Sequence, residues 1–455
     1  MKKGIFTLAA LLATASLFAQ TNPAITAWLQ NTTVTARHYV SGNSTAINDA
    51  DLVNVQSVKY SANYVYAATT GLPSYVTGPF LDGNPSLATS QSAIFKVPLN
   101  PTKNGGTATP TTGGNIGLFI NGVALFDYRD GVSWQNANKR LGGGPLTQKN
   151  GNGDGVWNRD AIVGELGGFD CSKAHPAMGN YHHHQNPSAF KLDLKVISNV
   201  CNLYNAEGLY AIDSVKHSPL IGFAYDGFPI YGSYANKNPS GKGGVVRMKS
   251  GYQLRNITTR TTDATGKTVT AGPNVTDTFP LGYFREDYVF VANPNDSSYL
   301  DEHNGRFCIT PEYPQGIYCY FATVNASWNS AYPYVVGPTF YGNKVAVKVA
   351  SIAETVSTYV PSTSNIVSNK IENLKVNIFP NPASDLLVVQ RLDLNRDNIE
   401  IVVYDIAGRQ MDKASILQGS TMVCFDTKTW YAGEYLVKMF TSGGVLTKRI
   451  SVIKD

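Results

Sequence analysis

Short stretches of alternating polar and apolar residues dominate the first part of the chain, from Thr21 to about Asn100. The segment VQSVKYSANYVYAAT, which begins at Val55, shows this pattern, and glycine and proline residues interrupt it at short intervals. An alternation with period two is typical of β-strands that bury one face. Gly, Tyr, Thr, Val and Asn are abundant throughout the chain, whereas the patterns typical of helices are scarce. We therefore predict a mainly β protein.

Two segments with a glycine between apolar runs predict β-hairpins. The segment GLFINGVALFDY begins at Gly117 and carries Asn121-Gly122 between two apolar runs. The segment GFAYDGFPIYG begins at Gly222 and carries Asp226-Gly227 at the same place. Asn-Gly and Asp-Gly pairs between apolar runs are strong signals for a two-residue hairpin turn.

A second pair of matching segments indicates an internal duplication. An ungapped alignment pairs two sets of residues: Glu165, Gly168, Cys171, Gly179 and Tyr181 with Glu302, Gly305, Cys308, Gly316 and Tyr318. Together with the two hairpin segments, this predicts a duplicated unit with pseudo-twofold symmetry. In this alignment His182 corresponds to Cys319 and His184 to Phe321, so a histidine pair is present in the first copy only.

The two ends of the chain differ from its middle. Residues 1–20 begin with two lysines, continue with a short apolar run and end in small residues, as a secretory signal peptide does. No later segment approaches the roughly 18 to 20 apolar residues of a membrane-spanning helix. Residues 351–373 are rich in Ser, Thr, Val and Asn and predict a linker. Residues 374–455 contain short strands joined by Gly and Pro turns and predict a small β-sandwich, which leaves residues 21–350 as a large β-rich domain.

Composition narrows the function classes. The chain has 455 residues, of which 43% are hydrophobic and 15% charged, so a large core and two or more domains are possible. The net charge of +5 is mild and is not gathered into basic runs, so we do not expect nucleic-acid binding. Five cysteines in an exported chain favour disulfides, and we expect the pairs Cys171–Cys201 and Cys308–Cys319, with Cys424 left over.

Residues 165–184 hold four of the seven histidines and are the strongest candidate for chemistry. If residues 179–185 form a strand, His182 and His184 share one face, and Tyr181 and His183 share the other. Neutral imidazoles bind zinc, copper, iron or nickel. A third ligand from Glu165, Asp170 or His175 would complete a site for a divalent transition metal such as zinc or copper. The alternative is that these histidines are structural and bond only to their neighbours.

A second, weaker metal candidate lies just before this cluster. Asn150, Asn152 and Asp154 stand at alternate positions before Gly155, as at the start of a calcium loop. The twelfth position of that loop, however, is Ala161 instead of glutamate. A glycine-rich loop with Asx turns explains the segment more simply than a calcium site does.

The middle of the chain resembles the YHYH-domain proteins, a family of secreted bacterial proteins. The motif stands here as Tyr181-His182-His183-His184, so His183 replaces the second tyrosine. The resemblance covers residues 55–345 through an ordered set of further segments: GLPSYVTGP from Gly71, GLFINGVALFDY from Gly117, HSPLIGFAYDGFPIYG from His217, LDEHNGRFCITPEYPQGIYCYFAT from Leu300 and YPYVVGPTFYG from Tyr332. These segments add four second-tier site candidates: His217, Asp226, Glu302 and His303. The family has no settled activity, so the resemblance implies a fold and a place to look.

The C-terminal region resembles the type A sorting domain of the type IX secretion system. The matching features are the turn at residues 380–382, the D-x-x-G-R turn at 405–409, the G-x-Y strand at 433–435 and the basic pair at 448–449. This resemblance implies export by the type IX secretion machinery. The mature protein would then be secreted or lie on the outer cell surface after passing through the periplasm.

Two functions follow as hypotheses. The first is a secreted metal-binding domain, and whether it is catalytic stays open. The second is a non-catalytic surface module that binds glycans or other extracellular ligands through some of the 26 Tyr and 19 Phe residues. A serine hydrolase is a weaker third hypothesis, because the chain has no G-x-S-x-G motif.

Overall fold

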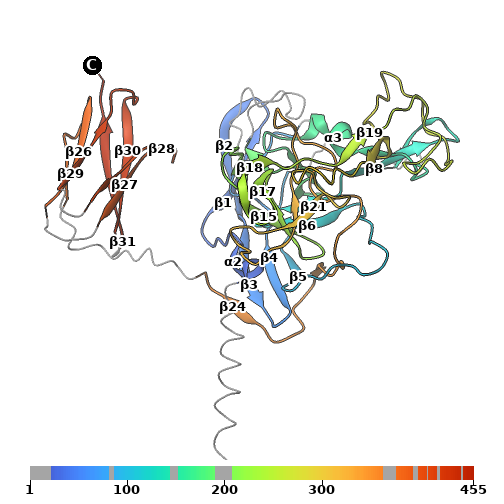
Figure 1. Ribbon diagram of the computed structural model, residues 1–455, viewed down its shortest axis with the longest axis horizontal. Coiled ribbons are helices and arrows are strands. Elements are labelled where there is room, and N and C mark those ends of the chain that lie inside the picture. Colours follow the sequence, from blue (N-terminus) through green and yellow to red (C-terminus); the bar gives the residue numbers. More distant parts are fainter. Residues whose placement is uncertain are drawn as a thin grey trace, which may run out of the picture. The chain divides into compact units, whose positions relative to one another are not determined.

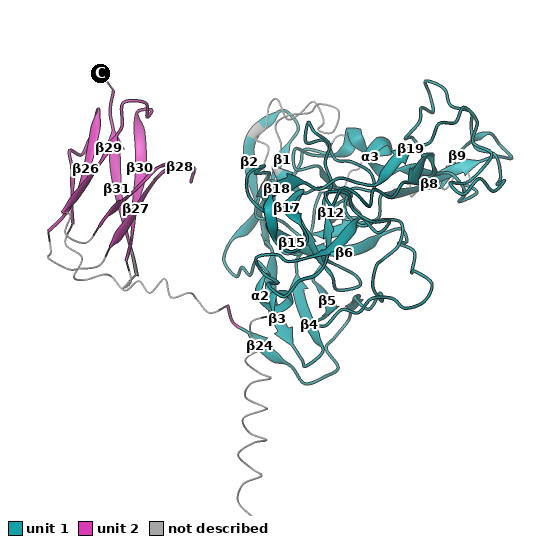
Figure 2. Ribbon diagram, viewed as in Figure 1, with its two compact units in different colours: residues 1–359 teal, residues 360–455 magenta. Residues whose placement is uncertain are grey.

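A computed structural model gives the fold of the chain (Figure 1). It describes residues 22–80, 87–143, 152–189, 208–361, 376–392, 398–406, 408–417, 421–441 and 444–454. The chain divides into two compact units, Met1–Tyr359 and Val360–Asp455 (Figure 2). Both units are built from β-strands, so the predicted fold class is confirmed. Among the described residues, no helix is long and apolar enough to cross a membrane.

Two large sheets organise unit 1. The first has eight strands in the order β11 (Ala174–Ala177), β12 (Asn180–His183), β7 (Ala124–Phe126), β6 (Asn115–Phe119), β15 (Leu220–Ala224), β16 (Pro229–Tyr231), β22 (Ile317–Phe321) and β21 (Gly305–Cys308). The second has five strands in the order β23 (Val347–Val349), β5 (Ala93–Pro98), β4 (Tyr64–Thr69), β3 (Val55–Tyr60) and β24 (Ser357–Tyr359). Apolar side chains of both sheets, among them Val58, Phe95 and Phe223, form one core.

Smaller elements complete unit 1. A three-stranded sheet has the order β10 (Asn158–Asp160), β8 (Arg129–Gln135) and β9 (Arg140–Gly143). The remaining strands form pairs: β1 (Thr35–Val40) with β2 (Asn43–Leu52), β13 (Ser188–Ala189) with β14 (Tyr210–Ala211), β17 (Tyr234–Asn238) with β18 (Lys242–Arg247), and β19 (Tyr252–Leu254) with β20 (Tyr288–Phe290). The helical turns are α2 (Pro23–Thr26), α3 (Ala161–Gly164), η2 (Leu166–Gly168) and η4 (Arg285–Asp287).

The eight-stranded sheet has pseudo-twofold symmetry, as the duplication predicts. Each half consists of two hairpins, β6–β7 with β11–β12 and β15–β16 with β21–β22. In each half the last strand runs parallel to the second, β12 beside β7 and β22 beside β16. The register agrees as well, because His183 lies opposite Leu125 and Tyr320 lies opposite Ile230. The two halves meet at the antiparallel pair β6–β15.

Glycine allows the two halves to meet closely. A Cβ atom on Gly222 would lie only 2.7 Å from the carbonyl oxygen of Leu118 in β6. A Cβ atom on the equivalent Gly117 would lie 3.0 Å from the carbonyl oxygen of Phe223 in β15. Any larger residue at Gly222 would therefore push β6 and β15 apart.

The ungapped alignment of the two copies is correct only in its last part. His175 lies opposite His182, and Arg306 lies opposite Cys319, so His175 corresponds to Arg306 and not to Glu312. The reason is the loop 309–316 between β21 and β22, which replaces the tight turn Met178-Gly179 between β11 and β12. The matched Glu, Gly and Cys residues before these turns are therefore not structural equivalents.

Both predicted hairpins are confirmed, but their loops have three residues instead of two. In the first hairpin, the amide of Phe119 donates to the carbonyl of Val123, and Gly122 has a φ of 78°. In the second, the amide of Ala224 donates to the carbonyl of Phe228, and Gly227 has a φ of 87°. A turn followed by a left-handed glycine is the usual three-residue hairpin loop.

Two further expectations need correction. The thiols of Cys308 and Cys319 are free, so the predicted disulfide between them is not formed. The two residues are diagonal neighbours, because Cys308 lies opposite Ile317 and Cys319 lies opposite Arg306. Cys201 lies outside the described residues, so its pair with Cys171 stays a prediction.

The second correction concerns the linker. Residues 357–359 form strand β24, which pairs with β3 at the edge of the five-stranded sheet. Unit 1 therefore extends beyond residue 350, and a linker can begin only after Tyr359. Residues 362–373 of the expected linker and the expected signal peptide lie outside the described residues.

Unit 2 is the predicted β-sandwich. One sheet has the order β25 (Val376–Phe379), β26 (Leu386–Arg391) and β29 (Met422–Asp426), and the other has the order β28 (Gln410–Ile416), β27 (Ile399–Asp405), β30 (Gly433–Thr441) and β31 (Gly444–Val452). Apolar side chains from both sheets, among them Leu387, Val403 and Val437, form a separate core. At the D-x-x-G-R turn, Asp405 Oδ1 accepts a hydrogen bond from the amide of Arg409 (2.8 Å).

Candidate metal centre

The hairpin β11–β12 places His175 and His182 directly opposite each other. Residues opposite each other in a sheet project from the same face, and the two ring centroids lie 4.7 Å apart. The turn between the strands is tight, because Met178 and Gly179 have φ values of 49° and 84°. Two consecutive positive φ values are typical of a two-residue hairpin turn, which fixes this register.

His184 and Glu165 complete the cluster. His184 follows β12 directly, and its Nε2 lies 3.1 Å from Nε2 of His182. Glu165 lies at the end of α3, and its Oε2 lies 3.1 Å from His175 Nε2 and 3.0 Å from His184 Nε2. The four potential ligand atoms all lie within 4.8 Å of one another. The cluster thus draws its four residues from three places in the sequence: Glu165, His175, and the pair His182 and His184.

The position of Glu165 depends on the start of α3. Asp160 caps this helix, since its Oδ1 accepts a hydrogen bond from the amide of Ile162 (2.8 Å). Its Oδ2 accepts a hydrogen bond from the hydroxyl of Tyr334 (2.7 Å), and Asp160 is completely buried. A distant part of the chain therefore holds the helix that presents Glu165 to the histidines.

Backbone carbonyls fix the tautomers of two histidines. Nδ1 of His182 lies 2.8 Å from the carbonyl oxygen of Asn180, and Nδ1 of His184 lies 2.6 Å from that of Asp127. A carbonyl only accepts hydrogen bonds, so each Nδ1 must carry the hydrogen, and each neutral ring has its lone pair on Nε2. Metal-binding histidines are commonly oriented by such bonds to backbone carbonyls.

Three hydrogen-bond acceptors therefore face one another: Nε2 of His182, Nε2 of His184 and Oε2 of Glu165. The separations of 3.0 and 3.1 Å would normally require a hydrogen between the atoms. Oε2 of Glu165 is buried, and apart from its contacts with His175 and His184 it has no hydrogen-bond partner among the described residues. A positive charge between these atoms would remove the repulsion among their lone pairs.

Burial and neighbouring charges shift the pKa values of His182 and Glu165, which favours a neutral His182 and an ionised Glu165. Burial, together with His184 and His175, lowers the pKa of His182 well below its usual value. Burial raises the pKa of Glu165, but the imidazoles of His184 and His175 outweigh this and hold that pKa well below its usual range. The side chain of Glu165 is 22% exposed and those of His175 and His184 only 7% and 2%, so solvent reaches the cluster on the Glu165 side.

Aromatic rings enclose the cluster. The ring of Phe126 stacks on His182 with centroids 3.8 Å apart, and Phe169 meets His175 edge-on at 5.1 Å. Neither residue was a candidate from sequence. The parallel pairing of β7 with β12 places Phe126 beside the histidines, and a local sequence pattern does not show such a pairing.

Asp170 does not join the cluster. Its Oδ2 accepts hydrogen bonds from the amide of Gly78 (2.9 Å) and the hydroxyl of Tyr181 (2.8 Å), and its Oδ1 from the amide of Ser172 (2.9 Å). Burial raises the pKa of Asp170 to about 6. Asp301 makes the equivalent bond to Tyr318 in the second half of the sheet, so this aspartate belongs to the repeated framework.

His183 projects from the opposite face of β12, as predicted. Its Nε2 accepts a hydrogen bond from the hydroxyl of Tyr75 (2.8 Å), and its Nδ1 lies 3.3 Å from the carbonyl oxygen of Lys173. The ring is fully buried and contacts Phe119 edge-on. His183 is therefore not placed to contribute to the metal cluster.

The four second-tier candidates lie outside the cluster. Asp226 is a buried turn residue whose Oδ2 accepts hydrogen bonds from the hydroxyl of Tyr320 (2.6 Å) and the amide of Gly342 (2.8 Å). Nε2 of His303 lies 3.9 Å from Glu302, whose side chain is 59% exposed. Nδ1 of His217 contacts the carbonyl of Ser218 (2.8 Å).

Only part of the candidate calcium loop lies within the described residues. Asn150 lies outside the described residues, and Oδ2 of Asp154 accepts a hydrogen bond from the amide of Asn136 (2.7 Å). Calcium binding at this loop stays a prediction.

Comparisons with known proteins identify two families along the chain. The YHYH protein family matches residues 94–333, and the secretion system C-terminal sorting domain matches residues 377–454. A comparison with curated proteins found no match. Among solved structures, the chain is similar to a DUF3244 family protein with an immunoglobulin-like β-sandwich fold from Bacteroides vulgatus, with 22% identity, a TM-score of 0.16, and coverage of 18% of this chain and 86% of that chain. The sorting domain indicates export by the type IX secretion system to the outside of the cell. The chain belongs to the YHYH protein family and ends in a secretion system C-terminal sorting domain.

Proposed function

We propose that the YHYH domain of this exported protein binds one divalent transition metal ion, zinc or copper, through Glu165, His175, His182 and His184. The observation that carries the proposal is the convergence of three hydrogen-bond acceptors at 3.0 to 3.1 Å. A tetrahedral zinc site with bonds of about 2.0 to 2.1 Å sets its ligand atoms about 3.3 Å apart. The three short contacts, of 3.0 to 3.1 Å, are close to that value, and all four ligand atoms lie within 4.8 Å of one another.

The donor set favours transition metals over calcium. Three imidazoles and one carboxylate suit zinc or copper, whereas calcium prefers six to eight oxygen ligands. The carboxylate of Glu165 would offset part of the metal charge in a buried place, where an isolated ion is costly. His175, His182 and His184 would hold the ion from the protein interior, and Glu165 would close the site toward solvent.

Four protein ligands are typical of structural zinc sites, whereas catalytic sites usually keep one position open. The cluster therefore supports metal binding more directly than turnover. A bound ion would supply Lewis acidity if Glu165 gave way to a water molecule or substrate. Catalysis is not part of the proposal.

Export forms the second part of the proposal. Residues 1–20 would direct passage across the inner membrane as a signal peptide, and the sorting domain would direct passage across the outer membrane. A Cys171–Cys201 disulfide fits this exported location.

The glycan-binding alternative has less support from the fold. None of the tyrosines that the structure describes in unit 1 is exposed, and many pack against one another in the core. Sugar-binding platforms need rings that are open to solvent on one face. Packing accounts for the buried tyrosines, whereas half-buried tyrosines such as Tyr64, Tyr299 and Tyr313 keep part of their side chains in solvent.

Metal analysis of purified full-length protein tests the proposal. Wild type should carry about one zinc or copper ion per chain, and His182→Ala, His184→Ala and Glu165→Gln should each lose most of it. The matched controls are His183→Tyr, on the opposite face of the same strand, and His303→Ala, outside the cluster. Both should keep the wild-type content. Metal-free wild type under metal-replete conditions, or equal content in all variants, would show that the histidines are structural.

A further inference from the structure

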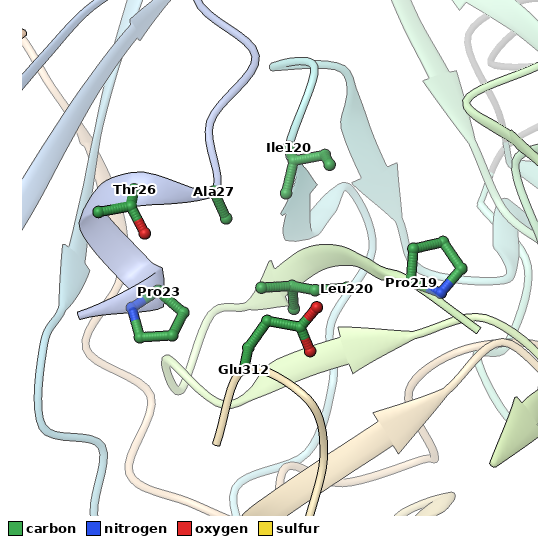
Figure 3. A pocket seen from close by; sticks show the side chains of 7 residues that line it. All are labelled: Pro23, Thr26, Ala27, Ile120, Pro219, Leu220 and Glu312. Carbon is green, nitrogen blue, oxygen red and sulfur yellow. The ribbon is translucent and has the colours of Figure 1, made fainter. Parts of the chain in front are cut away.

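An open pocket lies between the α2 segment, the β6–β7 loop and the start of β15, apart from the histidine cluster. It has a volume of about 400 Å³. Its walls combine apolar and polar surface. The apolar residues are Pro23, Ala27, Ile120, Pro219 and Leu220, and the polar ones are Thr26 and Glu312. Figure 3 shows the side chain of Glu312 extending among these residues. The volume lies within the range of small-molecule sites, which is about 300 to 1,000 Å³.

Glu312 is the ionisable residue of the pocket, and Tyr231 fixes its orientation. The hydroxyl of Tyr231 donates a hydrogen bond to Oε2 of Glu312 (2.7 Å) and lies 2.8 Å from the hydroxyl of Thr310. Because the hydrogen of Tyr231 goes to Glu312, the hydroxyl of Thr310 must donate to Tyr231. The carboxylate is therefore held in place before any ligand arrives.

Among the described residues, Glu312 has no Lys or Arg partner. Burial lowers the pKa of the neighbouring His217 and outweighs the raising effect of the Glu312 charge, which favours the neutral ring. None of the described basic side chains forms an ion pair with it. Arg306 lies on the same half of the sheet, but its guanidinium donates to the backbone carbonyls of Asn236, Lys237 and Ser297. A carboxylate in partly apolar surroundings gains most from a ligand that brings a positive charge.

A second unsatisfied acceptor lies next to Tyr231. The ring of His217 meets that of Tyr231 edge-on, with centroids 5.3 Å apart. Nδ1 of His217 bonds to the carbonyl of Ser218, which leaves Nε2 as an acceptor. That Nε2 atom is buried and has no hydrogen-bond partner among the described residues. The hydroxyl hydrogens of Tyr231 and Thr310 are already used in hydrogen bonds, so Glu312 and Nε2 of His217 are the groups here that can accept a further one.

Pseudo-symmetry relates this pocket to the metal cluster. Phe126 is the last residue of β7 and lies opposite Asn115. Tyr231 is the last residue of β16 and lies opposite Leu220. Both strand pairs have a register shift next to these residues. Phe126 stacks on the ligand His182, whereas Tyr231 holds Glu312. The same place in each half of the sheet therefore supports a different polar site. A metal ion fits the first, but a single carboxylate does not provide the ligand set for an ion in the second.

We propose that this pocket binds a primary ammonium group carried on a short apolar chain. The ammonium would donate to the Glu312 carboxylate, and the methylene groups would lie against Leu220, Ile120 and the prolines. A free alkylamine and the side chain of a lysine share this chemistry. The proposal does not depend on the metal site.

Ligand-observed NMR on full-length protein tests the proposal with n-butylamine, which is protonated at neutral pH, and with uncharged n-butanol. The amine should bind and the alcohol should bind at least about tenfold more weakly, because only the amine pairs with the carboxylate. Glu312→Gln should weaken amine binding about tenfold or more and leave the metal content unchanged. Glu302→Gln, an exposed carboxylate away from the pocket, is the matched control and should bind as wild type does.

Two further comparisons sharpen the result. Binding should weaken as salt rises, since the interaction is ionic and partly exposed. N-acetyl-lysine methylamide replaces the free amine in a parallel titration, and the tighter ligand of the two identifies the source of the ammonium. Equal binding of amine and alcohol, no amine binding, or an unchanged affinity in Glu312→Gln would each overturn the proposal.

Discussion

His183 and Tyr320 occupy equivalent positions in the two halves of the eight-stranded sheet. Both side chains are fully buried, and both reach a polar partner: Tyr75 for His183 and Asp226 for Tyr320. The framework therefore accepts a tyrosine at this position when a suitable partner is present. The replacement of the second tyrosine of the YHYH motif by His183 changes the buried network behind the histidine cluster and leaves Glu165, His175, His182 and His184 in place.

Asp226 supports a prediction about pH. Burial raises its pKa from 3.8 to about 6. A carboxyl group whose pKa is raised by folding stabilises the folded state most below its unfolded pKa, and this contribution is lost as pH rises through the folded pKa. The free energy of unfolding of wild type, relative to the non-titrating Asp226→Asn, should therefore fall by about 2 kcal/mol between pH 4 and pH 7. Chemical denaturation at several pH values measures this difference.

The control for this experiment is Glu302→Gln, which removes an exposed carboxylate of the same unit. Its difference from wild type should change little over the same pH range. A wild-type advantage over Asp226→Asn that stays constant from pH 4 to pH 7 would contradict the raised pKa of Asp226.

The sequence predicted part of the candidate site. Spacing alone placed His182 and His184 on one face, because side chains alternate along a strand. It left Glu165, Asp170 and His175 as alternatives for further ligands. The structure brings Glu165 and His175 to the pair, and Asp170 bonds to Gly78 and Tyr181 instead. That choice depends on contacts between distant segments, such as the bond from Tyr334 to the cap of α3, which no local pattern records.

At the scale of elements, the hairpin signals were reliable and the alignment across loops was not. Glycine between apolar runs marked both central hairpins, since a left-handed residue is needed there whatever the partner strand is. The sequence did not show that loop 309–316 is longer than the turn Met178-Gly179. A chance match of Glu, Gly and Cys residues suggested an alignment without a gap.

The second hairpin turn gives a prediction about stability. A Cβ atom on Gly227 would lie 2.4 Å from Cγ of Pro98, and the residue has a φ of 87°. Gly227→Ala should therefore combine backbone strain of about 1 to 2 kcal/mol with a steric clash, and lower the free energy of unfolding by about 2 kcal/mol or more. Thermal and chemical unfolding measure the effect.

Gly266→Ala is the matched control for backbone strain. Gly266 has a φ of 86°, but a Cβ atom there would meet no atom within 4 Å. This variant should lose only the strain contribution of about 1 to 2 kcal/mol. Equal losses in the two variants would show that the contact between the hairpin and Pro98 does not limit the size of residue 227.

At the scale of the whole molecule, the sequence separated the two units but placed their boundary too early. The change in composition near residue 351 is real, yet residues 357–359 still pair with β3. A short edge strand needs no apolar pattern, because its backbone hydrogen bonds to the neighbouring strand define it. Both residues Ser357 and Thr358 are exposed, which explains why the segment was predicted as a linker.

The two-unit organisation leads to a prediction about export. Removal of residues 374–455 deletes the sorting domain and leaves every strand of unit 1, including β24, so unit 1 should fold and remain in the periplasm. Fractionation of cells and medium, with metal analysis of the retained protein, measures both outcomes. Truncation after residue 351 removes β24 as well and exposes the edge of β3, so this shorter protein should melt at a lower temperature than the longer one. If the protein that lacks only residues 374–455 appears in the medium at the wild-type yield, the C-terminal domain does not direct sorting. If that protein is unfolded, unit 1 does not fold independently.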